Sequence, residues 1–359
     1  MDIRNQRQEE FANKWLESDR FNILYLCPRF GKIRTSTLIL NKYPDNARIL
    51  IAYPDVKIKK SWEEDLIKWG YSNTNITYTT HLSLKNHADE VYDLIILDET
   101  HLLSEAQKEV CQQLFDNNNH VLGLTGTLSR WTEKELREDL GLKVLVRYPI
   151  EKAIEEGILP DYEISVIKVP LDNKIRINYK GRWKTEKQRF DNLMWVVRKQ
   201  EIEGSPSFFM KLKVIDLLMN SVSRKNKTKE IIQKHSDERL LVFCGRTEIA
   251  DSLGIPSYHS KKNEKGIFQN FVEGKISHLA VVKIGNAGVT YTPLNRIILN
   301  HFDSNAEKMA QRINRAMSYE YSNPDKKAKI IIISSDENIE LKWLTKSLEF
   351  FDKNKIKYL

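Results

Sequence analysis

The 359-residue chain has few cysteines and no long apolar run. Its three cysteines (Cys27, Cys111 and Cys244) are odd in number and lie far apart. This excludes a disulfide scaffold and a Cys-type zinc site, and fits a reducing cytosol. No run approaches the roughly 18–20 apolar residues that a membrane span needs, and the charged start, MDIRNQRQEEF, lacks the apolar middle of a signal peptide. We therefore expect a cytoplasmic protein with no membrane partner.

Apolar and charged residues are both plentiful. Hydrophobic residues make up 41% of the chain, enough to bury a sizeable core. Lys plus Arg number 57 and Asp plus Glu number 49, which gives a net charge of +8. This mild basic excess is compatible with a polyanionic partner and does not identify one. At roughly 100–200 residues per domain, the length indicates two or three domains.

Short apolar runs alternate with helical patterns in both halves of the chain. We predict strands at 21–26, 48–52, 92–97, 121–124, 239–244, 278–282, 296–300 and 329–334. Ser104 and Gln107 have the spacing of a capping box and predict a helix over 104–115. Near-continuous apolar strands separated by helices are typical of parallel sheets covered on both faces. We predict an α/β protein with domain boundaries 1–148, 149–212 and 213–359.

The predicted middle segment is basic. Between Lys168 and Lys199 there are ten Lys or Arg residues against three Asp or Glu. The aromatic residues interleaved with these charges are Tyr179, Trp183, Phe190 and Trp195. They could line a nucleic-acid path, with rings stacking on bases, or pack a solvated linker against a neighbouring domain. Trp183 lies between Arg182 and Lys184, next to Gly181, which suits a hairpin tip or a strand-separating wedge.

Two polar motifs follow predicted strands of the first half. Gly31 and Lys32 come where a strand turns into a helix, a place where backbone N–H groups and the helix dipole attract phosphate. Lys32 would reach the terminal phosphates. Asp98 and Glu99 end another apolar run 66 residues later, so both motifs fall on one edge of a sheet. Asp98 would hold Mg²⁺, and Glu99 would orient and deprotonate a water. Together they favour nucleotide hydrolysis over an ordinary turn and a solvated helix start.

The order of these segments resembles a superfamily 2 nucleic-acid helicase of the DExH type over nearly the whole chain. The segments that carry the resemblance are RNQRQ (4–8, adenine-reading Q-motif), CPRFGK (27–32, Walker A), DETH (98–101, Walker B), TGT (125–127, motif III), LLVFCGRT (240–247, motif IV), KIGNAGVTY (283–291, motif V) and QRINRAM (311–317, motif VI). The compact, Lys-rich style resembles phage-encoded DNA helicases.

The resemblance implies two tandem RecA-like domains, joined by the basic middle segment, with ATP and Mg²⁺ in the cleft between them. The catalytic residues it implies are Lys32, Asp98 (also the metal ligand), Glu99, Gln311 and Arg315. The nucleotide-binding residues are Arg4, Gln8, Pro28, Arg29, Phe30, Gly31, Lys32, Ile33, Arg34 and Arg312. The nucleic-acid-binding residues are Thr80, Thr127, Arg246, Asn286 and Thr290, to which we add Trp183.

Three positions depart from the family pattern. Ile33 stands where a Ser or Thr hydroxyl normally binds Mg²⁺, and Thr35 is a poor substitute. In motif VI, Asn314 replaces a glycine and Ser318 replaces the final arginine. Loss of an arginine finger can cost about 10³–10⁵ in rate. We therefore expect a working but slow ATPase.

The resemblance implies an ATP-dependent DNA helicase or translocase in phage-type replication, recombination or repair, acting as a monomer in the host cytoplasm. One alternative is an RNA helicase of the same fold. A second is an ATP-gated nucleic-acid clamp that hardly hydrolyses, which Ile33 and Ser318 favour. A third is the motor subunit of a restriction or defence complex, although no nuclease or methyltransferase motif accompanies it.

Overall fold

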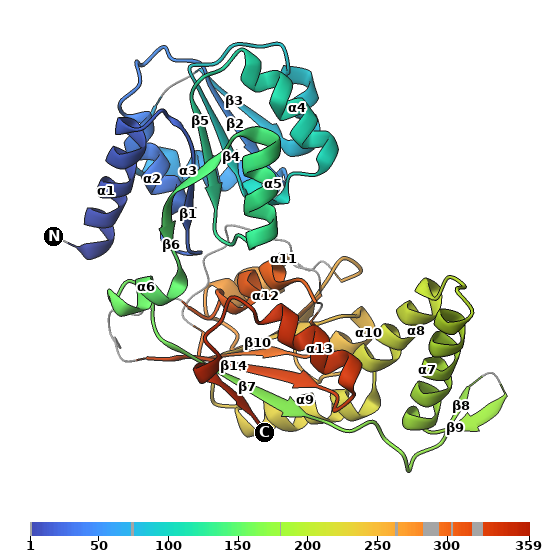
Figure 1. Ribbon diagram of the computed structural model, residues 1–359. Helices are drawn as coiled ribbons and strands as arrows, with labels where there is room; N and C mark the ends of the chain where they lie inside the picture. The colour runs from blue at the N-terminus through green and yellow to red at the C-terminus, as the bar shows by residue number, and fades with distance from the viewer. Residues whose placement is uncertain are drawn as a thin grey trace. The chain divides into compact units, whose positions relative to one another are not determined.

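The computed structural model describes residues 2–72, 75–179, 181–262, 265–282, 294–302, 304–317 and 326–359. The described chain divides into two compact units, one ending at Pro160 and the other beginning at Asp161 (Figure 1). Each unit is built around one parallel β-sheet with helices on its faces. The predicted α/β class is therefore confirmed.

The first unit contains a six-stranded sheet of order β3-β2-β4-β5-β1-β6. The strands are β1 (Phe21–Leu26), β2 (Ile49–Tyr53), β3 (Ile76–Thr80), β4 (Leu94–Asp98), β5 (Val121–Thr125) and β6 (Lys143–Tyr148). All neighbouring strands pair in parallel. Strands β2, β4 and β5 are buried along their whole length, because helices cover both faces of the sheet.

Two groups of helices cover this sheet. The helices of the first unit are α1 (Ile3–Glu17), α2 (Lys32–Leu40), α3 (Lys57–Lys68), α4 (Glu105–Asp116), α5 (Arg130–Leu140) and α6 (Ile150–Glu155). Helices α4 and α5 pack Leu114 and Leu136 into a core with Ile95 and Leu97 of β4. Helices α1, α2 and α3 pack side by side on the other face (Figure 1). The predicted capping box of Ser104 and Gln107 begins α4.

The second unit contains a seven-stranded parallel sheet of order β11-β12-β10-β13-β14-β7-β15. The strands are β7 (Tyr162–Lys168), β10 (Leu240–Cys244), β11 (Ser257–Tyr258), β12 (His278–Val282), β13 (Arg296–Leu299), β14 (Ala328–Ser334) and β15 (Ile356–Tyr358). Strand β7 pairs with β14 along seven registered residue pairs. The residues that follow α6 therefore supply a strand of the second sheet.

Helices and a small hairpin surround this second sheet. The helices are α7 (Glu186–Ile202), α8 (Phe208–Met219), α9 (Val222–Lys234), α10 (Thr247–Asp251), α11 (Lys265–Val272), α12 (Ala306–Ile313) and α13 (Asn338–Ser347). Strands β8 (Ile177–Tyr179) and β9 (Arg182–Lys184) form an antiparallel hairpin beside α7 (Figure 1). Helices α7 and α8 bury Phe190, Val197, Val214 and Leu218 in a separate small core.

The described residues contain no helix that combines the length and the hydropathy required to cross a bilayer. Cys27, Cys111 and Cys244 are buried free thiols.

Candidate active site

The loop between β1 and α2 has the backbone geometry of an anion site. Arg29 and Gly31 have positive φ angles of 65° and 105°, and α2 begins directly afterwards at Lys32. The N–H groups in the first turn of a helix have no partner within the helix, and the N-cap residue of α2, Gly31, has no side chain to cap them. These N–H groups and the positive end of the helix dipole attract phosphate at this point.

Gln8 on α1 holds this loop from the other side. Its Nε2 donates a hydrogen bond of 2.8 Å to the carbonyl oxygen of Phe30, and the residue is only 3% exposed. The Phe30 ring is buried against the rings of Phe11 and Tyr148. A Cβ on Gly31 would lie 2.5 Å from Gln8 Nε2. Of the predicted adenine-reading segment, Gln8 is thus the residue that contacts the phosphate loop.

The other predicted nucleotide-binding residues of the first unit have varied partners. Arg4 Nη2 donates to the carbonyl oxygen of Ile158 over 2.7 Å. The Arg34 guanidinium lies 4.5 Å from the centre of the Trp69 ring, a cation–π contact. Ile33 is half-buried in the first turn of α2.

Lys32, Asp98 and Glu99 meet at the carboxyl ends of β1 and β4. Lys32 Nζ pairs with Glu99 Oε1 and lies 3.4 Å from Asp98 Oδ1. Asp98 is only 6% exposed. Glu99 has a φ of 52°, in the left-handed region that residues with a Cβ seldom adopt and that is enriched at functional sites. The three residues predicted to carry hydrolysis in this unit therefore form one cluster beside the phosphate loop.

Burial and mutual attraction set the charges in this cluster. Burial raises the pKa of Asp98, and the neighbouring Lys32 amine offsets this only in part. Burial also works to raise the pKa of Glu99, but the neighbouring Lys32 amine lowers it below its usual value. Burial alone would lower the pKa of the Lys32 amine, but the carboxylates of Glu99 and Asp98 outweigh this effect and raise it. The cluster therefore holds a charged lysine against an ionised Glu99, the state in which a carboxylate can accept a proton.

His101 connects Glu99 to the TGT segment. Its Nδ1 lies 3.5 Å from Glu99 Oε2 and 2.8 Å from Thr125 Oγ1. The Thr125 hydroxyl donates its one proton to the carbonyl oxygen of Thr127, so its oxygen accepts from His101. Burial lowers the pKa of His101 to about 4, which keeps the ring neutral at pH 7. Thr127 itself is buried.

The TGT segment also contacts the phosphate loop directly. A Cβ on Gly126 would lie 3.2 Å from Cγ of Pro28, so the proline ring packs on the glycine. The TGT segment thus contacts the phosphate loop through Gly126 and the DETH segment through Thr125.

Trp62 is a site residue that the sequence analysis missed. From α3, its indole Nε1 donates a hydrogen bond of 3.0 Å to Asp98 Oδ2. The sequence shows Trp62 only as an apolar position of a helical pattern, because nothing in the spacing indicates that its N–H meets a carboxylate.

The carboxylate chemistry of the cluster fits Mg²⁺. This ion takes oxygen ligands, keeps several waters, and is commonly bound through one or two carboxylates together with substrate phosphates. Asp98 supplies such oxygens, whereas Ile33 has none. The Thr35 hydroxyl is fully buried and donates to the carbonyl oxygen of Gly31 over 3.2 Å. It therefore does not replace the hydroxyl that Ile33 lacks.

Five predicted nucleic-acid-binding positions lie away from this cluster in sequence. The Thr80 hydroxyl, at the end of β3, donates to Ser83 Oγ over 3.0 Å. Arg246 precedes α10 and pairs with Asp216 on α8. Trp183 in β9 is 64% exposed. Asn286 and Thr290, with the rest of segment 283–291, lie outside the described residues.

The predicted motif VI residues lie at the end of α12. Gln311 is exposed on this helix, and Arg312 Nη1 donates to the carbonyl oxygen of His301 over 3.2 Å. Arg315 is half-exposed in the turn that follows, where its N–H donates to the carbonyl oxygen of Arg312. Ser318 lies outside the described residues.

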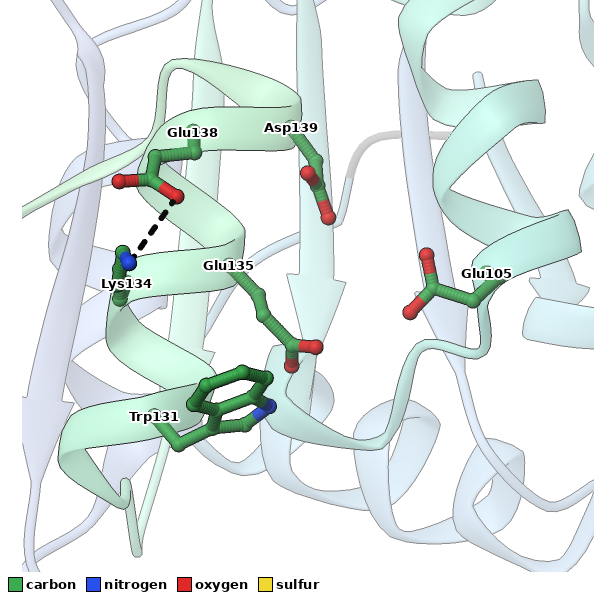
Figure 2. A pocket seen from close by; sticks show the side chains of 6 residues that line it. All are labelled: Glu105, Trp131, Lys134, Glu135, Glu138 and Asp139. Carbon is green, nitrogen blue, oxygen red and sulfur yellow. Dashed lines mark ion pairs between the residues drawn. The ribbon is translucent and has the colours of Figure 1, made fainter.

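A surface pocket between α4 and α5 has the wrong charge for a nucleotide. Figure 2 shows its lining: Glu105, Trp131, Lys134, Glu135, Glu138 and Asp139. The lining contains four carboxylates and one lysine, and that lysine pairs with Glu138 over 3.9 Å. Phosphates would be repelled from this pocket, so the loop after β1 remains the candidate nucleotide site.

Comparison with known proteins gives matches to helicases. Residues 223–320 match the model of the helicase conserved C-terminal domain. The chain is 24% identical over 360 residues to the DNA 3'-5' translocase XPB2 of Sulfurisphaera tokodaii. This alignment covers 91% of this chain and 80% of that protein. These matches support a superfamily 2 helicase, a class of ATP-hydrolysing enzymes that act on nucleic acid.

Solved structures share the fold at low identity. S. cerevisiae Dbp5 bound to RNA and ADP BeF3 has a TM-score of 0.63 at 10% identity, covering 98% of this chain and 89% of that one. The Pyrococcus furiosus Hef helicase domain has a TM-score of 0.53 at 14% identity, covering 97% and 100%. A DEAD box protein of Methanococcus jannaschii has a TM-score of 0.55 at 17% identity, covering 100% and 92%. The predicted tandem RecA-like fold is confirmed.

Proposed function

We propose that this chain is an ATP-dependent DNA translocase or helicase. The observation that carries the proposal is the cluster of Lys32, Asp98 and Glu99 at the edge of the first sheet, beside a loop shaped for phosphate. In that cluster a half-buried lysine, an ionised carboxylate and a second carboxylate would supply the positive charge, the base and the metal ligand that phosphoryl transfer needs. The match of residues 223–320 to a helicase domain supports a second domain of the same motor.

Each residue of the first unit would have a separate task. The N–H groups at the start of α2 and the Lys32 amine would hold the phosphates, and Asp98 would hold Mg²⁺ through its carboxylate. Bound Mg²⁺ would supply positive charge that offsets the charge of the phosphates. Glu99 would orient the attacking water and accept its proton. His101 would hold the Glu99 side chain in place beside Thr125, because its Nδ1 lies close to both.

Gln311, Arg312 and Arg315 would complete the site from the second unit. Their place in a segment that resembles motif VI supports this role, since an arginine supplied from a second domain stabilises the transferring phosphoryl group only when both domains close on the nucleotide. Thr80, Thr127, Arg246, Asn286 and Thr290 remain predicted contacts to the nucleic-acid backbone, which position the strand without recognising its sequence. We expect a monomer in the cytoplasm.

DNA is the favoured substrate, because the relative with 24% identity is a DNA translocase. The Dbp5 structure contains RNA, which makes an RNA helicase the first alternative. Ile33 and Ser318 favour the second alternative, an ATP-gated clamp with little turnover. A phage-type role in replication, recombination or repair is supported by the resemblance of the sequence alone.

ATP hydrolysis by the purified chain with Mg²⁺ tests these candidates. The rate is measured without nucleic acid and with single-stranded DNA, duplex DNA and RNA, beside Glu99→Gln. We expect single-stranded DNA to stimulate hydrolysis, and Glu99→Gln to lower the stimulated rate about 10²–10⁴-fold, the usual contribution of a general base. Greater stimulation by RNA would favour the RNA helicase. Nucleotide binding with no turnover above Glu99→Gln would favour the clamp.

A further inference from the structure

The hydrogen bond from Trp62 to Asp98 is buried and directional. Trp62 is fully buried on α3, and its Nε1 lies 3.0 Å from Asp98 Oδ2. The other oxygen, Oδ1, accepts the backbone N–H of Glu99 over 3.0 Å and lies 3.4 Å from Lys32 Nζ. Both oxygens of the carboxylate therefore have donors, and the three contacts together define the plane of the group.

The chemistry of indole limits what Trp62 can do at this site. Its nitrogen is a donor only, so it neither coordinates a metal ion nor transfers a proton at neutral pH. A hydrogen bond to a carboxylate is shorter and about twice as strong as one between neutral groups. The indole N–H therefore acts on this site through Asp98, whose carboxylate it orients and helps to keep ionised.

Orientation of Asp98 matters more in this chain because of Ile33. In the phosphate-loop motif the hydroxyl after the lysine binds Mg²⁺, and isoleucine has no such group. The next hydroxyls on α2 are committed to its own backbone. Thr35 donates to the carbonyl of Gly31, Ser36 to that of Lys32 over 3.0 Å, and Thr37 to that of Ile33 over 2.8 Å.

We propose that Trp62 is a positioning residue for the metal-binding carboxylate, and that its indole N–H compensates for the missing hydroxyl at Ile33. The proposal rests on the proposed nucleotide hydrolysis. It predicts that loss of the N–H weakens the binding of nucleotide with Mg²⁺ and leaves binding without Mg²⁺ unchanged. A tryptophan that only fills the core would affect both equally.

The first unit contains a matched control for this substitution. Trp15 on α1 is also fully buried, but its Nε1 has no hydrogen-bond partner among the described residues. Trp62→Phe and Trp15→Phe therefore remove the same atoms from similar surroundings, and only the first removes a hydrogen bond. Neither the phosphate loop nor the Lys32 cluster includes Trp15.

The test is calorimetric titration of the full chain with an ATP analogue that cannot be hydrolysed, with Mg²⁺ and with chelator. We expect Trp62→Phe to weaken Mg²⁺-dependent binding about tenfold, which is the lower end of what a hydrogen bond to a charged group contributes. Trp15→Phe should change neither condition. If the phenylalanine variant does not fold, benzothienylalanine at position 62 keeps the bicyclic ring and replaces the N–H with a sulfur atom that cannot donate a hydrogen bond.

The same titration separates the outcomes. If Trp62→Phe matches Trp15→Phe while the unaltered chain binds nucleotide with Mg²⁺, the role of Trp62 is refuted and the proposed function stands. If the unaltered chain binds no nucleotide, both are refuted. In an Ile33→Thr background the cost of Trp62→Phe should be smaller, because a hydroxyl is present again. An equal cost in both backgrounds would refute the compensation, since independent effects add.

Discussion

Gly31 is the position of the phosphate loop at which a side chain would meet both an unfavourable backbone conformation and a close neighbour. Its φ of 105° lies in a region that glycine enters freely and L-residues avoid. Its missing Cβ also makes room for Gln8, whose Nε2 would be 2.5 Å from that atom. Backbone strain and a steric clash therefore coincide at one residue. The clash involves the side chain that holds the Phe30 carbonyl.

We predict that Gly31→Ala lowers nucleotide affinity at least tenfold, because Gln8 must leave the Phe30 carbonyl and the loop must change its backbone. Gly157→Ala is the matched control. Gly157 also has a positive φ, 70°, but nothing lies within 4 Å of a Cβ built there. Strain alone should cost the control about 1–2 kcal/mol of stability, with nucleotide affinity unchanged. Titration with nucleotide and thermal unfolding of both variants measure these effects. Equal nucleotide affinities of Gly31→Ala and Gly157→Ala would contradict the prediction.

At the residue scale, the sequence predicted those site residues that can be recognised from their immediate neighbours in the chain. Lys32 follows a glycine at the start of a helix, and Asp98 ends an apolar strand, so both are visible from neighbours in the chain. The contacts of Gln8 with Phe30 and of Trp62 with Asp98 join positions 22 and 36 residues apart. No spacing rule connects such pairs, because the path of the chain between them decides whether they meet.

At the scale of elements, a buried ion pair joins two helices of the second unit. Arg224 on α9 pairs with Glu340 on α13, and the two side chains are 2% and 0% exposed. Arg224 Nη1 also donates to the carbonyl oxygen of Asn300 over 3.0 Å, and Glu340 Oε2 accepts from Ser335 N over 2.9 Å. Every partner of this pair is inside the protein, so neither charge can turn to water if the other is removed.

We predict that Arg224→Met lowers the free energy of unfolding by about 3–5 kcal/mol, the usual cost of leaving one member of a buried pair alone. Lys227→Met is the control on the same helix. Lys227 pairs with Glu230 over 2.7 Å at the surface, and such pairs contribute about 0–1 kcal/mol. Urea unfolding of the full chain, followed through both transitions, provides the comparison. A similar decrease in the free energy of unfolding for the two variants would show that the buried pair contributes no more to stability than the surface pair.

The strands that the sequence predicted are those buried on both faces. Strands β2, β4 and β5 form continuous apolar runs, which helices on both sides of the sheet require. Strand β3 (ITYTT) lies at a sheet edge and is mostly half-buried, so it shows no apolar run. Strand β7 alternates buried and more exposed residues, so it too lacks a continuous apolar run. Edge and one-sided strands depend on their partners, which the sequence does not show.

At the scale of the whole molecule, basic residues are concentrated in the middle segment between Lys168 and Lys199, where ten Lys or Arg residues stand against three Asp or Glu. The hairpin of β8 and β9 exposes Trp183, and the Arg189 guanidinium lies 4.2 Å from the centre of the Tyr179 ring. Exposed rings among cations are typical of surfaces that stack bases and follow phosphates. This arrangement supports the expectation that the basic middle segment lines a nucleic-acid path.

Charge and stacking make different predictions for this surface. Each cation that contacts a phosphate contributes to the salt dependence of binding, whereas a ring contributes affinity that salt changes little. Trp183→Ala should therefore weaken binding to single-stranded DNA by about 1–3 kcal/mol, with the slope of log K against log salt unchanged. Arg182→Ala should reduce that slope by about 1.

Trp131→Ala is the control, because Trp131 is 69% exposed on the first unit, beside the acidic pocket, where DNA is repelled. Fluorescence anisotropy with a labelled single strand at several salt concentrations measures both quantities. Equal affinities for Trp183→Ala and Trp131→Ala would place the strand elsewhere and leave the hairpin aromatics as packing residues. A weaker affinity for Trp183→Ala alone, with the slope preserved, would identify the hairpin as a stacking surface. Loss of unwinding in the same variant would extend that role to strand separation.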